Sequence, residues 1–403
     1  MMEIGYKEFP TELSVDLPIS KSIVARQLVL DYIHNTPLAD RINRLEGYFL
    51  PLDIKYIANA LLRLEKRKRA GNREPILLET GQSGTAYRFL LVLALWEKGD
   101  VTLSHEPQLT KRIKAIDLLP FIEIGAKIDF RPDQNKTYIK GNRKVTGDVD
   151  DSKWNTSQFS SALLLTEPLH RGSIRLQKDL NRSSYSYYEL TQKVIKEYRT
   201  TTSTSEEGDW SAAAFWYQLM VSHPEIHAIH FNNLNAESAQ PDRVITRIFQ
   251  NFGINTDANN KLTRIPKVSN KLHIDLSQSL DLFPSIMISA IWLNIPFEIS
   301  GIKNLRVKES DRISSIIENF KALGVDDINV KDDIIYRINL QNVPRVTFKD
   351  NAILNSYDDH RIAMSFGVLA TSITNKNYKL IGAEAVSKSY PNFFESLLKK
   401  QQG

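Results

Sequence analysis

The segment Leu305–Gly324 carries a dense group of charges at the start of an expected helix. Its apolar residues recur with the 3.6-residue period of a helix face: Ile313, Ile316, Ile317, Phe320 and Leu323. Gly324 follows, where a left-handed terminating residue is expected. The first turn holds four charged residues: Lys308, Glu309, Asp311 and Arg312. Cations at a helix N-terminus cost a few tenths of a kcal/mol each. The segment is therefore either a solvated helix start or an anion site, because an anion would reverse that cost.

Basic residues also stand at or near four other expected helix starts, at Lys21, Arg88, Arg361 and Lys388. Five such starts together favour a shared anionic cleft built from helix N-termini. The carboxylates Asp281 and Glu309 would then be candidates for proton transfer in that cleft. Asp281 precedes an expected helix over 285–293, so a role as a turn or capping residue is the alternative. The chemistry indicated is that of small phosphorylated and carboxylated molecules.

A small-residue turn, Gly81-Gln82-Ser83-Gly84, lies between an expected strand over 76–78 and an apolar helix over 89–96. Such a turn can cradle an anion at the helix N-terminus. No Gly-Lys-Ser/Thr closes it as in a Walker A loop, and the third glycine of a dinucleotide fingerprint is missing. No nucleotide cofactor is expected.

Composition narrows the class of protein. The chain has 403 residues, which favours two domains, and its net charge of +5 suits small anions but does not argue for nucleic acid. The basic run 66–69 is interpreted as a solvated helix end. Cysteine is absent, which excludes disulfides, thiolate metal sites and a cysteine nucleophile. Pro224 interrupts the histidine group at 223, 227 and 230, so no metal site is expected.

The order of elements indicates an α/β protein. A strand is expected over 13–17 and helices over 23–32, 53–66, 212–220 and 362–370, with a last helix around Phe393 and Leu397. Helices ending at Gly125, Gly253 and Gly324 each return to an apolar segment, which suggests a repeated helix–strand unit. The polar segment 199–207 is interpreted as a linker or an exposed loop, with a domain boundary at its end. No apolar run reaches membrane-spanning length and no secretory apolar segment is seen near the first residues, so a cytoplasmic enzyme is expected.

Motifs in one order along the chain resemble the 5-enolpyruvylshikimate-3-phosphate (EPSP) synthase family of enolpyruvyl transferases. They are L-P-x-S-K-S-x-x-x-R, G-x-x-G-T-A-x-R, T-S-Q, R-V-K-E-S-D-R, D-D-H-R and S-K-S-Y-P, from about residue 12 to residue 397. The R-V-K-E-S-D-R and D-D-H-R segments are the most specific.

The resemblance implies a fold of two similar α/β domains of repeated helix–strand units, an inside-out α/β barrel arrangement with the active site in the interdomain cleft. One domain would span residues 20–206. The other would combine residues 1–19 with 207–403 and carry Asp281, Glu309, Arg361 and Lys388. A monomer is expected, with no metal or cofactor and no nucleic-acid or membrane partner.

The reaction implied by the family moves the enolpyruvyl group of phosphoenolpyruvate to the 5-hydroxyl of shikimate 3-phosphate and releases phosphate. Shikimate 3-phosphate would be bound by Lys21, Ser22, Arg26, Thr156, Ser157, Gln158, Ser184, Tyr187, Asp281, Asn304 and Lys308. Phosphoenolpyruvate would be bound by Lys21, Gly84, Arg112, Gln158, Arg312, Arg361 and Lys388. Among the catalytic residues, Asp281 would act on the hydroxyl. Glu309, with Lys21 or Lys388, would act on the methylene carbon and the leaving phosphate.

The sequence departs from the family pattern at a few positions. Ile19 replaces a usual glycine, Ala25 replaces a usual asparagine, and the segment 192–207 is short.

Two alternative functions remain. A degenerate homologue would bind anionic ligands without turnover. A transferase acting on UDP-N-acetylglucosamine usually carries a loop cysteine, which this chain lacks, and the T-S-Q and R-V-K-E segments favour shikimate.

Overall fold

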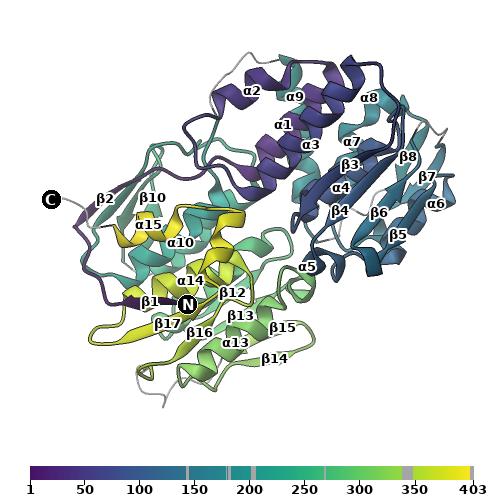
Figure 1. The fold of residues 1–403 in the computed structure, drawn as a ribbon. Helices are drawn as coiled ribbons and strands as arrows, with labels where there is room; N and C mark the ends of the chain where they lie inside the picture. Colours follow the sequence, from purple (N-terminus) through teal and green to yellow (C-terminus); the bar gives the residue numbers. More distant parts are fainter. Residues whose placement is uncertain are drawn as a thin grey trace. The chain divides into compact units, whose positions relative to one another are not determined.

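The chain was analysed as a computed structural model that describes residues 1–141, 145–177, 179, 183–200, 206–266, 269–337 and 348–399. It divides into two compact units (Figure 1). The first unit is Ser20–Glu206. The second unit combines Met1–Ile19 with Glu207–Gly403. Each unit is a mixture of helices and strands, in agreement with the α/β class expected from the sequence.

The first unit contains helices, strands and short 3-10 turns. Its helices are α1 (Lys21–His34), α2 (Leu38–Arg44), α3 (Leu52–Arg69), α4 (Gly84–Ala94), α5 (Pro107–Thr110), α6 (Leu119–Glu123), α7 (Gln158–Leu165), α8 (Glu167–His170) and α9 (Ser186–Thr200). Its strands are β3 (Ile76–Gly81), β4 (Val101–His105), β5 (Ile128–Arg131), β6 (Lys136–Ile139), β7 (Gly147–Asp150) and β8 (Ile174–Gln177). Short 3-10 turns are η1 (Ala115–Leu118), η2 (Pro132–Gln134) and η3 (Asp151–Lys153).

Two sheets of unequal size are present in the described part of this unit. Strands pair in the order β3-β4-β6-β5 in one sheet, and β7 pairs in parallel with β8 in the other. Helix α4 is buried on nearly every side, and it packs against α7 and α3. A helix that is apolar all round belongs in a core. This burial fixes the start of α4, which holds Gly84 and Arg88.

The second unit repeats this construction with more strands. Its helices are α10 (Trp210–Ser222), α11 (Ile245–Ile248), α12 (Phe283–Trp292), α13 (Arg312–Ala322), α14 (His360–Thr371) and α15 (Phe393–Leu398). Its strands are β1 (Met2–Gly5), β2 (Glu12–Val15), β9 (Ala228–Phe231), β10 (Ile254–Thr256), β11 (Lys261–Arg264), β12 (Leu272–Asp275), β13 (Phe297–Ser300), β14 (Asn329–Lys331), β15 (Ile334–Arg337), β16 (Ile353–Asn355) and β17 (Asn377–Ile381). Short 3-10 turns are η4 (Pro241–Val244), η5 (Phe249–Phe252), η6 (Leu280–Leu282), η7 (Lys303–Val307) and η9 (Ala383–Lys388).

The core of the second unit is a group of helices surrounded by sheets. Helices α10, α12 and α14 consist almost entirely of buried residues and pack against one another. The sheets have strand orders β10-β11-β9-β2, β12-β13-β15-β14 and β1-β17-β16. Strand β2 pairs in parallel with β9, with Leu13 opposite Ile229, which attaches the first residues of the chain to this unit. Ile19 is fully buried and forms a bridge with Gly208.

The structure confirms the expected glycine terminations and corrects some helix starts. Gly125, Gly253 and Gly324 all have positive φ values, which end their helical segments before the chain turns back. Helix α13 begins at Arg312 with Asp311 as its N-cap, so Lys308 and Glu309 lie ahead of the helix and not in its first turn. Because Asp311 accepts the Ser314 amide, it fixes that boundary.

Two further starts differ from the sequence expectation. Helix α4 begins at Gly84, five residues before the predicted Phe89, because Ser83 caps it by accepting the Ala86 amide. Lys388 is the last residue of η9 and not at the start of a helix, since α15 begins at Phe393.

Candidate functional site

Charged side chains from several elements of the second unit form one network of ion pairs, which we call the carboxylate–cation cluster. It comprises Asp281, Lys308, Glu309, Arg312, Asp359, Arg361 and Lys388. These residues come from η6, the segment before α13, the start of α13, the start of α14 and the end of η9. The cluster therefore unites residues that are widely separated in the sequence.

Arg312 is the centre of this cluster and is almost fully buried. Its Nε lies 2.8 Å from Asp359 Oδ2, its Nη1 lies 2.7 Å from Asp281 Oδ1, and its Nη2 lies 3.0 Å from Glu309 Oε2. Burial by itself would lower the pKa of Arg312, but Asp359 and the other carboxylates outweigh it and raise that pKa. Arg312 is consequently a permanent cation held by three carboxylates.

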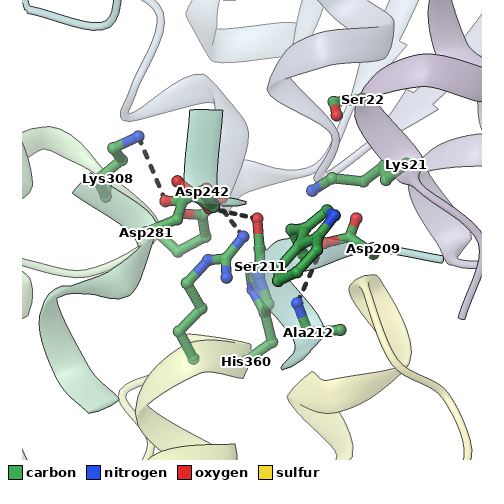
Figure 2. Close-up of polar contacts among 12 residues, drawn as sticks. Lys21, Ser22, Asp209, Ser211, Ala212, Asp242, Asp281, Lys308 and His360 are labelled. Carbon is green, nitrogen blue, oxygen red and sulfur yellow. Dashed lines mark hydrogen bonds and ion pairs between the residues drawn. The ribbon is translucent and has the colours of Figure 1, made fainter. Parts of the chain in front are cut away.

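Asp281 is surrounded by cations, although about a fifth of its side chain is exposed. Arg361 Nη2 donates to its Oδ2 at 2.8 Å, and Lys308 Nζ lies 3.6 Å from its Oδ1 (Figure 2). Burial would raise the pKa of Asp281, but Arg361, Lys308 and Arg312 together hold this pKa well below its usual range. Asp281 is thus ionised at neutral pH, as a proton acceptor must be, but it is a weak base while those cations stay paired with it.

Glu309 lies between two cations. Lys388 Nζ donates to its Oε1 at 2.7 Å, and Arg312 donates to its other oxygen. Both Glu309 and Lys388 are largely buried. A carboxylate and an ammonium group at this distance can exchange a proton directly, which makes the pair suitable for acid–base chemistry.

Asp242, at the start of η4, lies next to this cluster. The Ser211 hydroxyl donates to its Oδ2 at 2.5 Å, and Figure 2 shows its carboxyl group beside that of Asp281. Burial, followed by the charge of Asp281, raises the pKa of Asp242 to about 7. The neighbouring Asp209 caps α10 by accepting the Ala212 amide at 3.1 Å.

In the first unit, Arg26 of α1 is anchored against α7 and α9. Its guanidinium donates to Thr191 Oγ1 at 2.8 Å, to Ser22 O at 2.6 Å and to Tyr187 O at 3.0 Å. Burial, which the charge of Tyr187 partly opposes, lowers the pKa of Arg26 to about 10, so it remains a cation at neutral pH. The structure thus brings together three of the predicted shikimate 3-phosphate residues: Ser22, Arg26 and Tyr187.

A second group of the first unit gathers at the start of α4. Arg88 Nη1 lies 2.8 Å from Gln158 Oε1 and 3.2 Å from Gly84 O, and Gln158 Nε2 donates to Thr85 Oγ1 at 2.9 Å. Arg112 Nη2 lies 3.5 Å from the place that a side chain on Gly84 would occupy. Gly84, Arg112 and Gln158, all predicted to bind phosphoenolpyruvate, therefore share this site with Arg88.

The other predicted residues take these positions. Lys21 opens α1 and pairs with Asp53 of α3 at 3.0 Å. Thr156 accepts the Gln158 amide at 3.3 Å, and Ser157 directly precedes α7. Ser184 has a positive φ of 64° before α9, and Asn304 belongs to η7 of the second unit.

Several candidate residues were missed by the sequence interpretation. Asp359 belongs to the D-D-H-R motif but was given no role, although its buried carboxylate accepts from Arg312. Asp53, Thr191 and Asp242 carried no recognisable signal, because their contacts depend on partners distant in the sequence. Thr85 belongs to the G-x-x-G-T-A-x-R motif but was given no binding role. Arg88 was noted among the basic helix starts but was given no binding role.

The described ranges hold neither a metal-binding group nor a membrane-spanning helix. No group of histidine and carboxylate side chains there could hold a metal ion. In that same part of the chain, no helix has the length and apolar character needed to span a membrane.

The arrangement can bind anions and move protons. In the second unit, cations are held in place by carboxylates, and an incoming phosphate or carboxylate group could take over those cations. As a result, the released carboxylates would become stronger bases. In the first unit, Arg26 donates to a hydroxyl and to backbone carbonyl oxygens and remains a cation at neutral pH.

Comparison with known proteins gives a consistent result. The family model for EPSP synthase (3-phosphoshikimate 1-carboxyvinyltransferase) matches residues 10–397. A 3-phosphoshikimate 1-carboxyvinyltransferase from Bacteroides fragilis is 27% identical, covering 96% of this chain and 94% of that protein. Another from Clostridium kluyveri is 26% identical, covering 96% of this chain and 95% of that protein.

Solved structures show the same fold. An EPSP synthase from Acinetobacter baumannii has a TM-score of 0.66 at 18% identity, covering 98% of this chain and 97% of that chain. The enolpyruvyl transferase NikO from Streptomyces tendae has a TM-score of 0.62 at 12% identity, covering 98% of this chain and 96% of that chain. The family match over nearly the whole sequence, together with this two-domain α/β fold, shows that the chain belongs to the EPSP synthase family.

Proposed function

We propose that the protein transfers the enolpyruvyl group of phosphoenolpyruvate to the 5-hydroxyl of shikimate 3-phosphate and releases phosphate, as an enzyme of aromatic amino-acid biosynthesis. The observation that carries this assignment is the family match over residues 10–397, combined with the carboxylate–cation cluster. Both substrates are polyanions, and the cluster supplies cations next to groups that can transfer protons.

The reaction proceeds by addition and then elimination. In the first step the 5-oxygen forms a bond to C2 of phosphoenolpyruvate, its proton leaves to a base, and C3 gains a proton. In the second step C3 loses a proton and the bond between C2 and the phosphate oxygen breaks. Asp281 takes the hydroxyl proton, and Glu309 with Lys388 serves C3 and the leaving phosphate. Lys21 is a further candidate for this second role.

Substrate binding would prepare Asp281 for this task. In the structure its negative charge is neutralised by Arg361, Lys308 and Arg312, which keep its pKa low. A phosphoenolpyruvate anion that draws Arg361 toward itself would raise the basicity of Asp281. The base is therefore strengthened when the substrate to be attacked is bound.

The remaining binding roles follow the family resemblance and the local geometry. For shikimate 3-phosphate we assign Lys21, Ser22, Arg26, Thr156, Ser157, Gln158, Ser184, Tyr187, Asp281, Asn304 and Lys308. For phosphoenolpyruvate we assign Lys21, Gly84, Arg112, Gln158, Arg312, Arg361 and Lys388. Support comes from the contacts of Arg26 with its fixed acceptors and from the grouping of Gly84, Arg112 and Gln158. The oligomeric state proposed is a monomer, and the proposed location is the cytoplasm.

Phosphorus NMR of the purified protein with both substrates tests this function. We expect a new enolpyruvyl product and free phosphate. Asp281→Asn and Glu309→Gln should each lower turnover by roughly 10²–10⁴-fold, the usual range for a general acid or base. Glu298→Gln, which changes a half-exposed carboxylate of the same unit, is the matched control and should keep full activity.

The results also separate the alternatives. Binding of shikimate 3-phosphate without any product would identify a degenerate homologue. Turnover with UDP-N-acetylglucosamine in place of shikimate 3-phosphate would identify the related transferase. Full activity in both Asp281→Asn and Glu309→Gln would refute the assigned catalytic roles.

A further inference from the structure

Asp242 is a buried carboxyl group that the proposed reaction does not use. Its side chain is about 1% exposed, and Ser211 donates to one of its oxygens. Its other oxygen, Oδ1, is buried and has no hydrogen-bond partner among the residues that the structure describes. Burying an ionised carboxylate whose oxygen has no hydrogen-bond donor raises the free energy of the folded protein. This environment therefore favours the neutral, protonated form of Asp242.

The groups that face Asp242 come from several elements. Asp281 of η6 and Asp209 before α10 favour its neutral form, whereas Arg361 of α14 and the Ser211 hydroxyl favour its ionised form. Arg361 responds to both Asp281 and Asp242, and the pairing seen in the structure is with Asp281 at 2.8 Å. Arg361 thus has three carboxyl groups around it, Asp281, Asp242 and Asp209, and its ion pair is with Asp281.

The charge of the carboxylate–cation cluster depends on Asp242. Within the described part of the chain, four cations of the cluster face three carboxylates (Lys308, Arg312, Arg361 and Lys388; Asp281, Glu309 and Asp359). One positive charge remains to attract an anion while Asp242 is neutral. Ionisation of Asp242 would cancel that charge and give Arg361 a second anionic partner.

We propose that Asp242 is a positioning residue for Arg361: its neutral form leaves Arg361 directed at Asp281 and available to an anionic substrate, and its ionisation weakens anion binding by the cluster. The ligand is the phosphoenolpyruvate of the proposed function, so the inference rests on that function. The inference predicts that phosphoenolpyruvate binding weakens at high pH, and that this loss is caused by the ionisation of Asp242, which is not one of the proposed catalytic residues.

The test is the pH dependence of phosphoenolpyruvate binding, measured by calorimetry on the intact protein and on Asp242→Asn. Asparagine has the same shape and cannot ionise. We expect the affinity of the unmodified protein to fall at least tenfold between pH 6 and pH 9, and that of Asp242→Asn to change less than threefold. Glu298→Gln, the exposed control, should follow the unmodified protein. Equal pH profiles for the unmodified protein and Asp242→Asn would overturn the proposal.

The variant Ser211→Ala tests the same proposal if Asp242→Asn folds poorly. Ser211→Ala removes the hydroxyl that stabilises the ionised form, so the loss of affinity should move to higher pH. An unchanged or lowered transition in Ser211→Ala would overturn the proposal, since a merely structural role would not move the transition in that direction.

A third measurement does not depend on the enzymatic function. The unfolding equilibrium of the unmodified protein and of Asp242→Asn can be compared by chemical denaturation from pH 5 to pH 8. In the folded protein Asp242 keeps its proton to a higher pH than it does in the unfolded chain. From pH 5 to pH 8 the unfolding constant of the unmodified protein should therefore rise at least tenfold more than that of Asp242→Asn. If this difference is seen but no product forms with both substrates, the proposed function fails while the protonation of Asp242 stands. If the difference is absent, the proposal about Asp242 fails.

Discussion

Arg312 shows how a single residue can hold a site together. Its guanidinium contacts Asp359, Asp281 and Glu309 at the same time, and all three of its nitrogens take part. Asp359 approaches both Nε and Nη2, at 2.8 and 3.4 Å, so it fixes the plane of the group. Since Asp359 is fully buried at the N-cap of α14, the orientation of Arg312 is set by the fold and not by the ligand.

Asp359→Asn should therefore impair substrate binding more than chemistry. An amide has only one acceptor oxygen, so one of the two contacts between residue 359 and the Arg312 guanidinium is lost. A hydrogen bond to a charged group is worth about 1.5–3 kcal/mol, and we expect the KM for phosphoenolpyruvate to rise roughly tenfold or more. Steady-state kinetics would separate this rise from the smaller expected change in kcat.

Ser310→Ala is the matched control, because Ser310 Oγ donates to the same carboxylate at 3.3 Å and the substitution leaves that carboxylate in place. It should leave the KM close to that of the unmodified protein. An unaltered KM in Asp359→Asn would contradict the orienting role.

At the scale of elements, the start of α4 is built so that an arginine can lie against the backbone. Ser83 caps the helix, and Arg88 folds back one turn to contact Gly84 O and Gln158. A Cβ on Gly84 would lie 2.6 Å from Arg88 Nη1 and 3.5 Å from Arg112 Nη2. The missing side chain at residue 84 thus makes room for two guanidinium groups.

Gly84→Ala should raise the KM for phosphoenolpyruvate without unfolding the protein. The added methyl group would push aside the flexible end of Arg88 and break its contact with Gln158. Alanine is favoured over glycine in a helix by about 1 kcal/mol, so the free energy of unfolding should not fall strongly. Kinetics and thermal unfolding of the same preparation would measure both effects.

Gly172→Ala is a suitable comparison, because Gly172 has a positive φ but open space around it. That variant should lose some stability and keep its KM. If the KM of Gly84→Ala were unchanged, the close approach of arginine at this helix start would have no bearing on binding.

At the scale of the whole molecule, each unit depends on contacts between distant segments. Strand β2 joins β9, and a buried network in the first unit links Arg41 of α2 with Asp31 and with Glu206 at the end of that unit. Neutral histidines are buried as well. His105 lies between Thr110 and Thr137, and His223 lies between Glu225 and Thr371.

These histidines predict a loss of stability in acid. Burial lowers the pKa of His105 to about 4, and it also lowers the pKa values of His170 and His223. In this pH range the unfolded chain binds protons at these histidines that the folded protein does not bind. The stability that the histidines contribute is therefore full above the unfolded pKa of about 6.5 and declines as the pH falls toward 4. For His105 the loss would reach at most about 3 kcal/mol.

Urea denaturation between pH 7.5 and pH 4.5 would measure this dependence. The decline should be shallower in His105→Gln, whose side chain cannot take up the proton. His230→Gln, at an exposed position, is the control and should decline as the unmodified protein does. Parallel curves for His105→Gln and the unmodified protein would contradict the prediction.

The sequence by itself determined the class of fold, the positions of the main helices and the family. Helical periodicity places α13, and positive-φ glycines end it and two other segments, because those signals are local. The motifs around Lys21, Gly84, Lys308, Arg361 and Lys388 are local too. Their basic residues, at helix starts as expected from the sequence, were enough to indicate anionic substrates, although Lys308 and Lys388 lie outside helix starts in the structure.

Only the tertiary structure decided which charges meet. Asp281, Arg312 and Arg361 belong to three different elements, and no spacing rule predicts that one arginine will bind three carboxylates. Helix starts differed because capping is also decided in the fold. Ser83 starts α4 five residues before its predicted apolar segment, and Asp311 starts α13 only after Lys308 and Glu309. Asp242 stayed unnoticed because an aspartate after proline looks like an ordinary turn residue. Its unusual pKa arises from burial and from a neighbouring carboxylate, which exist only once the chain has folded.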